Sequence, residues 1–141
     1  MDEPLETLAA CHEHIEAQLA SLEQLTLRAD PESARAVMRY FDTEAVQHHR
    51  DEDESLFPRL RRLAADRGRP EVAAVIGDLE REHAVMDLQW SRLRSQLDAL
   101  AQGRAGALDA GEVTRFAWLY RRHLEQEAAT VLPFAREAAA T

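Results

Sequence analysis

Residues 70–102, PEVAAVIGDLEREHAVMDLQWSRLRSQLDALAQ, decide the fold that this sequence predicts. Apolar side chains recur at spacings of three and four residues, which is the pattern of a helix that buries one face. Pro70 marks the start, because proline is tolerated in the first turn of a helix. The buried face is Val72, Ile76, Leu79, His83, Met86, Trp90, Leu93, Leu97 and Leu100. His83 alone interrupts this apolar face, and a polar residue at that place needs a chemical reason.

Three further segments share this composition of Ala, Leu, Glu, Arg and Gln, which are strong helix formers. Turn signals separate them at Asp30-Pro31, at residues 66–70 and in the glycine-containing stretch 103–111. The predicted helices are 3–28, 32–65, 70–102 and 111–138. No segment alternates with a period of two, so we predict no strands. The sequence therefore predicts an all-α, up-down-up-down antiparallel four-helix bundle, with residues 1–141 as one domain.

Composition restricts the class of protein. Apolar residues make up 45% of the chain, which is typical of a globular protein and not of a disordered one. The net charge is −9 and no basic cluster is present, so we expect neither nucleic acid nor a membrane as partner. The lone Cys11 cannot form an internal disulfide, and no apolar signal core or membrane-spanning run is visible. These features predict a cytoplasmic protein.

The other three predicted helices also place a histidine on the apolar face. The face of the first helix is Leu5, Leu8, His12, Ile15, Leu19 and Leu22. The second and fourth helices carry His48 and His123, each followed four residues later by a glutamate, Glu52 or Glu127. Residues i and i+4 lie on one helix face, so both carboxylates point toward the core. A buried carboxylate is costly unless a cation accompanies it, and no Lys or Arg lies on these faces. A metal ion would supply the missing positive charge.

The depths of these residues along the bundle agree with a single site. His12 lies 16 residues before the end of the first predicted helix, and His48 lies 16 residues after the start of the second. At about 1.5 Å per residue, all the inward polar residues fall within a turn or two of one layer. The predicted metal ligands are His12, His48, Glu52, His83, His123 and Glu127. Imidazole and carboxylate donors suit iron, manganese or zinc, and the lack of thiolates argues against an iron–sulfur cluster.

Two extended motifs carry a family resemblance. They are H-x-x-x-E-x-x-x-L-F-P at residues 48–58 and H-x-x-x-E-x-x-x-x-L-P at residues 123–133, and each proline follows its histidine by ten residues. With single histidines on the other two helices, this pattern resembles the hemerythrin-like family, also called the HHE cation-binding domain, over nearly the whole chain. The resemblance implies two iron ions bridged by the two glutamates and by an oxo or hydroxo group. Because the sequence has no evident fifth inward histidine, it is most similar to the branch with four histidines and two glutamates, in which about one position per iron stays open.

This resemblance implies a non-haem di-iron protein that binds a small diatomic ligand, oxygen or nitric oxide, for sensing, scavenging or storage. It favours a metal- and ligand-binding protein over a dedicated enzyme. Three further functions remain open: a di-iron oxidoreductase acting on peroxide or nitric oxide, an iron donor for iron–sulfur cluster repair, and a bundle that binds zinc without a redox role. Zinc and manganese both suit the same donors, and the sequence identifies no redox partner.

Four polar residues near the predicted ligands have competing interpretations. We interpret His14 as a surface residue, since His12 and not His14 lies on the apolar face. His49 is turned about 100° from His48, which predicts a solvated position or one beside the ligands. Glu80 and Asp87 flank His83 in the sequence and could each add a carboxylate, but an exposed helix edge is the favoured interpretation.

Three more residues matter for the shape of the site. Tyr120 lies one turn before His123 on the inward face, where it could hydrogen bond a ligand or a carboxylate, although a packed core position is favoured. Pro58 and Pro133 each remove a backbone hydrogen bond within a predicted helix. They are expected to end or bend the helix just past the metal layer, and a bend there could also shape ligand access.

Overall fold

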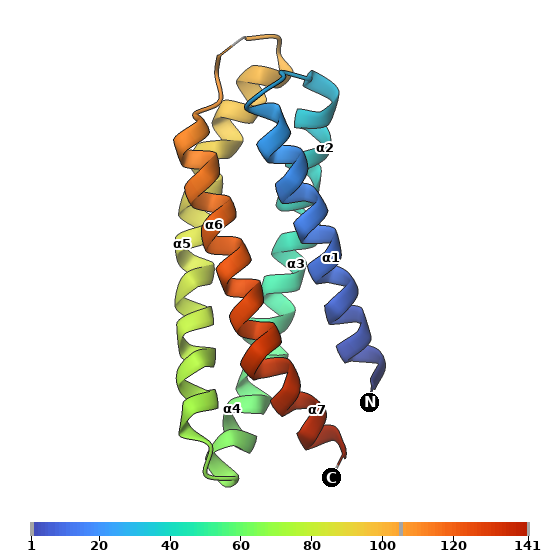
Figure 1. Cartoon of the computed structure of the whole chain (residues 1–141), viewed down its shortest axis with the longest axis vertical. Coiled ribbons are helices and arrows are strands. Elements are labelled where there is room, and N and C mark those ends of the chain that lie inside the picture. Colours follow the sequence, from blue (N-terminus) through green and yellow to red (C-terminus); the bar gives the residue numbers. More distant parts are fainter. Residues whose placement is uncertain (1, 105, 141) are drawn as a thin grey trace.

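The computed structural model describes residues 2–104 and 106–140, with side chains from residue 10 onward in these ranges. Its elements are α1 (Asp2–Leu25), α2 (Pro31–Asp42), α3 (Glu44–Asp51), η1 (Glu52–Leu56), α4 (Phe57–Asp66), α5 (Pro70–Ala101), α6 (Ala110–Gln126), η2 (Glu127–Val131) and α7 (Leu132–Ala140), where η marks a π-helical turn. They form four helical arms packed against one another, which confirms the predicted all-α bundle (Figure 1). The first arm is α1, the second runs from α2 to α4, the third is α5, and the fourth runs from α6 to α7. Leu5 and Leu8 lie outside the described side chains.

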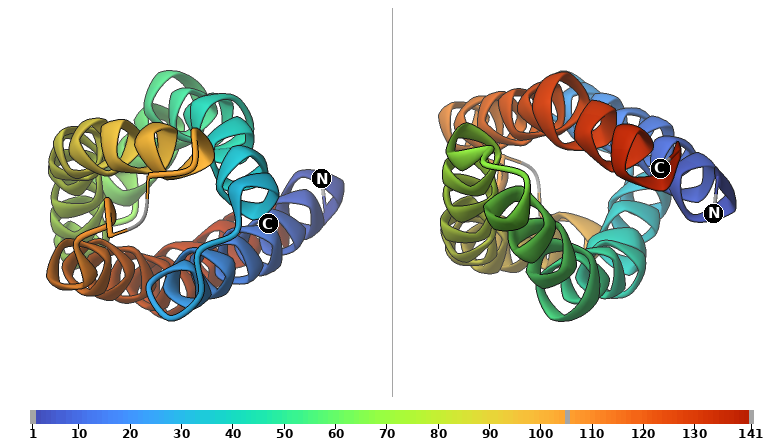
Figure 2. Two further views of the ribbon diagram at one scale, coloured as in Figure 1. Left: turned by 90° about the horizontal axis from the view of Figure 1, so that it is seen from above. Right: turned by 90° about the horizontal axis from the view of Figure 1, so that it is seen from below.

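The arms follow one another around the bundle. The helix α5 packs against α2, α4 and α6, and α1 packs against α2 and α6. Figure 1 shows both termini at the same end as the turn between α4 and α5, with the other two connections at the opposite end. Seen along the axis, the four arms form a closed ring around a shared interior (Figure 2). Each arm therefore runs antiparallel to its neighbours in the sequence.

Local sequence explains where the helices begin and end. The Asp30 side chain accepts a hydrogen bond of 3.2 Å from the Glu32 N–H, which caps α2. At the end of α4, Gly68 adopts a φ of 66° and the Arg69 N–H donates to the Ala64 carbonyl at 2.8 Å. This is the Schellman ending, in which glycine accepts the left-handed conformation without a steric penalty.

The predicted helix 32–65 is interrupted twice, once where the sequence predicted no break and once near Pro58, where an end or a bend was expected. The first interruption is at Thr43, where φ is −121° and ψ is −75°. The Thr43 hydroxyl donates to the Arg39 carbonyl at 2.6 Å, a local bond that competes with regular helix geometry and bends the chain. The second interruption is the π turn η1, and the predicted helix 111–138 has the matching turn η2.

Both π turns start at a predicted ligand and end just before a proline-containing turn. The Phe57 N–H donates to the Glu52 carbonyl, five residues earlier, and the Leu132 N–H donates likewise to Glu127. A new α-helix then begins, so Pro58 falls in a first turn, where its missing N–H is tolerated. The extra residue also keeps the buried face in phase, because Phe57 is fully buried five residues after Glu52. The prolines thus end one helix and start the next.

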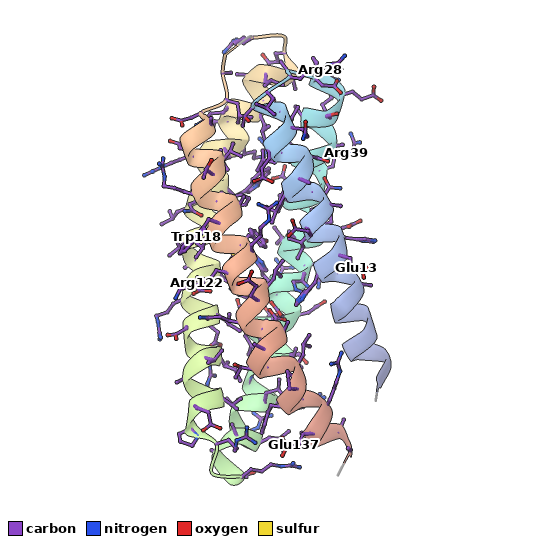
Figure 3. All side chains as sticks on the ribbon, in the orientation of Figure 1. Glu13, Arg28, Arg39, Trp118, Arg122 and Glu137 are labelled. Atoms are coloured by element: carbon purple, nitrogen blue, oxygen red, sulfur yellow. The ribbon has the colours of Figure 1, made fainter. Side chains whose placement is uncertain are left out.

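Two apolar clusters fill the bundle interior. The first lies among α1, α2, α6 and the second half of α5, and includes Ile15, Phe41, Leu97 and Phe116. The second lies among α4, α7 and the first half of α5, and includes Phe57, Ile76 and Phe134. Charged side chains such as Glu13 and Glu137, together with Trp118, point outward (Figure 3). No helix within the described ranges carries an apolar run long enough to cross a bilayer.

Candidate metal centre

A layer of polar side chains separates the two apolar clusters. Glu52, His83, His123 and Glu127 are all buried, with at most 3% of each residue exposed. His12 and His48 adjoin them and are partly buried. The six predicted ligands come from α1 (His12), α3 (His48), η1 (Glu52), α5 (His83), α6 (His123) and η2 (Glu127). The structure therefore brings together all six residues from four arms.

The six residues form two overlapping groups with the spacing of metal ligands. His12 and His48 share the outer half with Glu52 and Glu127, and His83 and His123 share the inner half with Glu52. Within each group, one donor atom from every residue lies within 4.8 Å of the others. Glu52 belongs to both halves, so the two groups are parts of one centre.

The two carboxylates each face both halves. For Glu52, Oε1 lies 3.3 Å from His83 Nε2 and Oε2 lies 3.6 Å from His48 Nε2. For Glu127, Oε1 lies 3.3 Å from His12 Nε2 and Oε2 lies 3.6 Å from His123 Nε2. Each half thus receives two imidazole nitrogens and one oxygen from each glutamate. This is the arrangement of two bridging carboxylates between two adjacent cation positions.

The donor atoms themselves lack hydrogen-bond partners. Both oxygens of Glu52, Oε2 of Glu127 and the Nε2 atoms of His83 and His123 are buried without one. Of the four close approaches above, only that of His12 to Glu127 has hydrogen-bond geometry. A buried polar atom left unpaired costs about 1–3 kcal/mol, and more when it is charged. Five such atoms aimed at one place fit cations that would satisfy them together.

Burial sets the protonation of these donors. It lowers the pKa of His48, and it lowers that of His123 to about 3, which favours the neutral, metal-binding form of these two imidazoles. Burial, and then the neighbouring Glu127, raise the pKa of Glu52 well above its ordinary value. Burial also acts to raise the pKa of Glu127, but the neighbouring Glu52 and His12 lower it to about 2. The two adjacent carboxyls thus have pKa values shifted in opposite directions, because two like charges at close range do not both form easily.

The two inner histidines each contact a carboxylate through Nδ1, the ring nitrogen that faces away from the centre. His83 Nδ1 lies 2.9 Å from Asp53 Oδ1, and His123 Nδ1 lies 2.9 Å from Glu82 Oε1. With Nδ1–H donating to a carboxylate, the bare Nε2 faces the centre, as in metal sites where an outer carboxylate fixes the ligand tautomer. Among the side chains that the structure describes, no carboxylate is paired in this way with His12 or His48.

The comparison with known protein families agrees with this geometry. The chain matches the hemerythrin HHE cation binding domain over residues 3–135. It belongs to the hemerythrin family. An uncharacterised protein of Haemophilus influenzae is similar to this hemerythrin domain, with 28% identity over 134 residues that cover 89% of this chain and 75% of the relative. The centre between the two apolar clusters is accordingly the candidate cation-binding site of this domain.

His49 lies beside the ligands of this hemerythrin domain rather than in solvent. Its ring stacks on His83 with the centroids 4.0 Å apart, and its Nε2 forms a hydrogen bond of 2.9 Å with the Tyr120 hydroxyl. Burial lowers the pKa of His49 to about 2, so the ring is neutral and can accept this bond. Tyr120 is buried in the core as predicted, and its hydroxyl forms a hydrogen bond with His49 rather than with a carboxylate.

Three polar residues near the predicted ligands in the sequence lie away from the donors in space. His14 is exposed on α1, in agreement with its interpretation as a surface residue. Glu80 pairs with Arg61 of α4, and Asp87 is exposed at the edge of α5, so neither joins the two ligand groups within the described residues. The favoured interpretation of an exposed helix edge therefore agrees with Asp87, whereas Glu80 is half-buried against Arg61.

The sequence interpretation missed Asp53 and Glu82. Asp53 directly follows Glu52, and Glu82 directly precedes His83. A neighbour in the sequence is turned by about 100° around the helix, so both residues lie off the apolar faces on which the ligands were sought. The available signal was the carboxylate next to a ligand, because a second carboxylate commonly holds a metal-binding imidazole from behind.

Proposed function

We propose that this hemerythrin-family chain is a non-haem di-iron protein of the branch with four histidines and two glutamates. It binds a small diatomic molecule, oxygen or nitric oxide, for sensing, scavenging or storage. The observation that carries this proposal is that each glutamate directs its two oxygens to different histidine pairs. His12, His48, His83 and His123 would hold the two metals, and Glu52 and Glu127 would bridge them, with residues 1–141 as a single domain.

The donor set supports iron and an open position. Each half offers two nitrogens and two oxygens, which is four donors for a metal that commonly takes six. An oxo or hydroxo bridge would occupy one more position and leave about one free on each metal. When bound, two irons would supply electrons and a place for a diatomic molecule. No cysteine is among the grouped donors of the described residues, so the site is not of the thiolate type.

The residues around the site favour the binding of a small ligand, because they orient the imidazoles and keep bulk water away from the metal layer. Asp53 and Glu82 hold the inner imidazoles in one orientation. Phe57 lies against His83 with nearly parallel rings, 6.0 Å between centroids. The apolar clusters on both sides keep water from the layer, which slows uncontrolled oxidation of a reduced metal.

Metal analysis with an optical spectrum of anaerobically purified protein tests this proposal. We expect about two irons per chain, and charge-transfer absorption in the near ultraviolet after oxidation. Stoichiometric zinc in a colourless protein would overturn the di-iron proposal. His14→Ala should keep the metal content of the wild type and so serves as the control variant.

A second candidate is an oxidoreductase that acts on peroxide or nitric oxide. The hydrogen-bonded Tyr120 and His49 favour it, because an O–H group and an imidazole next to the inner half can hold or pass a proton. Mixing the reduced protein with oxygen or nitric oxide separates the two functions. A stable adduct supports binding, whereas rapid oxidation with repeated turnover supports the enzyme.

A further inference from the structure

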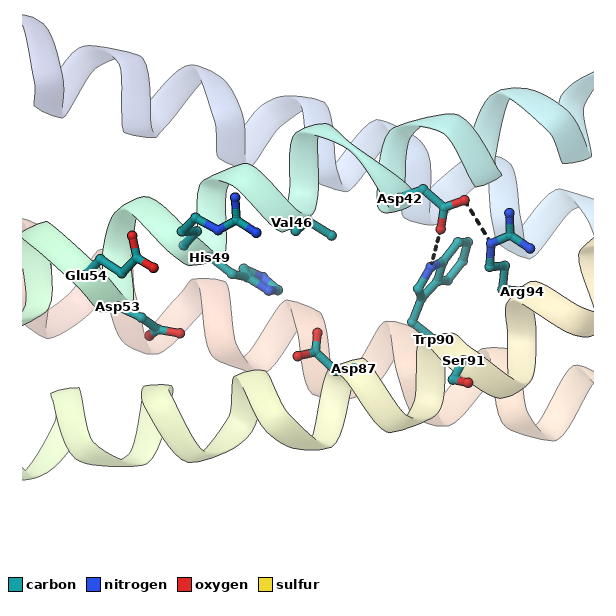
Figure 4. A pocket seen from close by; sticks show the side chains of 10 residues that line it. Asp42, Val46, His49, Asp53, Glu54, Asp87, Trp90, Ser91 and Arg94 are labelled. Carbon is teal, nitrogen blue, oxygen red and sulfur yellow. Dashed lines mark hydrogen bonds and ion pairs between the residues drawn. The ribbon is translucent and has the colours of Figure 1, made fainter.

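A cleft opens between the α2–α3 arm and α5 on one side of the bundle. Its volume is about 530 Å³, and His49 and Trp90 lie on its inner side (Figure 4). The Trp90 indole N–H donates to Asp42 at 2.9 Å, and Arg94 donates to the other oxygen of Asp42 at 2.8 Å. These bonds join α2 to α5 and fix the indole at the cleft wall.

A small chamber lies deeper behind this cleft. Its volume is about 30 Å³, and apolar side chains dominate its wall, with Phe41, Met86 and Phe116 among them. Since a water molecule needs about 10–15 Å³ by this kind of measure, the chamber holds only one or two water-sized molecules. The cleft and the chamber share four lining residues, which we call the neck. The neck is Val46, His49, Asp87 and Trp90.

The chamber ends at the inner half of the metal centre. His49 and Tyr120 line it and are joined by their hydrogen bond. On its other side, His49 stacks on His83, and the Tyr120 ring centroid lies 6.5 Å from that of His123. The hydrogen-bonded pair thus forms the inner wall of the chamber and touches the inner histidines.

From this arrangement we propose that a neutral diatomic molecule reaches the inner half through the cleft, the neck and the chamber. Val46 sets the width of the neck, and the His49–Tyr120 pair forms the last barrier. This inference rests on the proposed function, which it deepens by naming the route and the kind of molecule that can pass. Val46 sets the width because the facing Trp90 is fixed by Asp42.

The chemistry of the chamber selects for small and weakly polar molecules. Oxygen and nitric oxide form few hydrogen bonds in water and lose little free energy on leaving it. A water or peroxide molecule gives up hydrogen bonds that the apolar majority of the wall cannot replace, although His49, Asp87 and Tyr120 offer polar groups there. The volume excludes larger substrates. The route therefore excludes larger substrates by size, and the mainly apolar wall favours weakly polar diatomic ligands over peroxide.

Matched substitutions of two valines test the route in the iron-loaded protein. Val46 in the neck is 42% exposed, and Val85, which lies on α5 outside the neck, is 45% exposed. Val46→Phe should slow the association of nitric oxide with the reduced protein about tenfold, equivalent to about 1.4 kcal/mol on the entry barrier. Val85→Phe should leave the rate unchanged, and both variants should keep the wild-type metal content. Equal association rates for Val46→Phe and the wild type would overturn the route.

Dissolved oxygen tests the same route without metal. Oxygen is paramagnetic, so it speeds the relaxation of methyl protons that it approaches. Met86 lines the chamber and is 1% exposed, while Met38 is 8% exposed and does not line it. In the metal-free protein under oxygen, we expect relaxation of the Met86 methyl group to rise severalfold more than that of Met38, and Val46→Phe to remove this difference.

Oxygen-induced relaxation and ligand binding by the iron-loaded protein test the access route and the proposed function separately. If oxygen relaxes Met38 as much as Met86, the chamber is not an oxygen route and this inference fails. If Met86 is relaxed selectively but the iron-loaded wild type binds neither oxygen nor nitric oxide, the proposed function fails while oxygen access to the chamber stands.

Discussion

The inner and outer halves of the metal centre receive the same two carboxylates, yet their histidines have different surroundings. In the outer half, the side chains of His12 and His48 are 14% and 9% exposed, and their rings meet edge to face. In the inner half, the side chains of His83 and His123 are 4% and 2% exposed. Each inner imidazole also has a carboxylate on Nδ1, which the outer ones lack among the described side chains.

This difference separates two requirements of the proposed two-metal site. The shared glutamates would hold two adjacent metal positions, and their oxygens face both halves equally. The surroundings determine how firmly each half is prepared before metal arrives. The inner half is fixed by Asp53, Glu82 and the stacked His49, so its imidazoles lose less freedom on binding. We therefore expect the inner half to bind its metal more tightly than the outer half.

Substituting a glutamate that the two halves share should have the largest effect on metal content. Glu52→Gln keeps the shape of the side chain but removes the charge that both halves use, so we expect both metals to be lost or bound far more weakly. Metal content after dialysis against a chelator measures this. Glu54→Gln, on the same π turn but outside the two ligand groups, should retain both metals. Loss of a single metal from Glu52→Gln would contradict its bridging role.

Removing one histidine from each half should separate the halves. His83→Ala should empty the inner half and weaken the outer one through the shared carboxylates, so that less than one metal per chain remains. His12→Ala should leave the inner metal in place. A stepwise metal titration, monitored by calorimetry, distinguishes the two variants, and His14→Ala serves as the control. If His12→Ala lost more metal than His83→Ala, the expected order of affinity would be reversed.

Removing the carboxylates that bind Nδ1 of the inner imidazoles should lower the metal affinity of the inner half without abolishing metal binding. Asp53→Asn and Glu82→Gln each replace the carboxylate on an Nδ1 atom, and loss of such a partner typically lowers metal affinity about 10–100-fold. The effect should fall on the tighter of the two binding steps. Asp51→Asn, on the exposed surface nearby, should leave both steps unchanged. Two unchanged steps in Asp53→Asn would show that the carboxylate contributes nothing to the inner half.

Acid should not separate the two halves, and it should act on the stability of the metal-free protein as a whole. Burial lowers the pKa of His48, and lowers those of His49 and His123 to about 2 and 3, from an ordinary value of 6.5. As pH falls below about 6.5, the unfolded chain gains protons at these three sites that the folded protein does not, so the free energy of unfolding falls.

Glu52 opposes this trend, because burial raises its pKa and the folded protein keeps a proton that the unfolded chain releases. Three histidines against one carboxyl leave up to about two protons, or about 2.7 kcal/mol per pH unit at most. Denaturant unfolding at a series of pH values from 7.5 to about 5 measures the slope. A flat profile would show that the histidines are accessible to protons in the folded state.

Much of this structure could be predicted from local pattern. The spacing of three and four residues, with turn signals between helices, was sufficient for four arms, because each arm buries one face against its neighbours. The same spacing singled out His83, which is the polar exception on an apolar face. Even the π turn had a signal, since the step from Glu52 to Phe57 is five residues on a face that otherwise repeats at three and four.

The sequence by itself determined which side chains point inward and how deep they lie, and these depend only on helix geometry and the order of residues. Only the tertiary structure decided what each inward group meets. It turned the two oxygens of Glu52 toward different helices, placed Asp53 and Glu82 behind inner imidazoles, and stacked His49 on His83. Apart from the approach of Glu52 to His48, these are contacts between arms. They depend on the rotation and approach of one helix against another, which a pattern along a single helix does not specify.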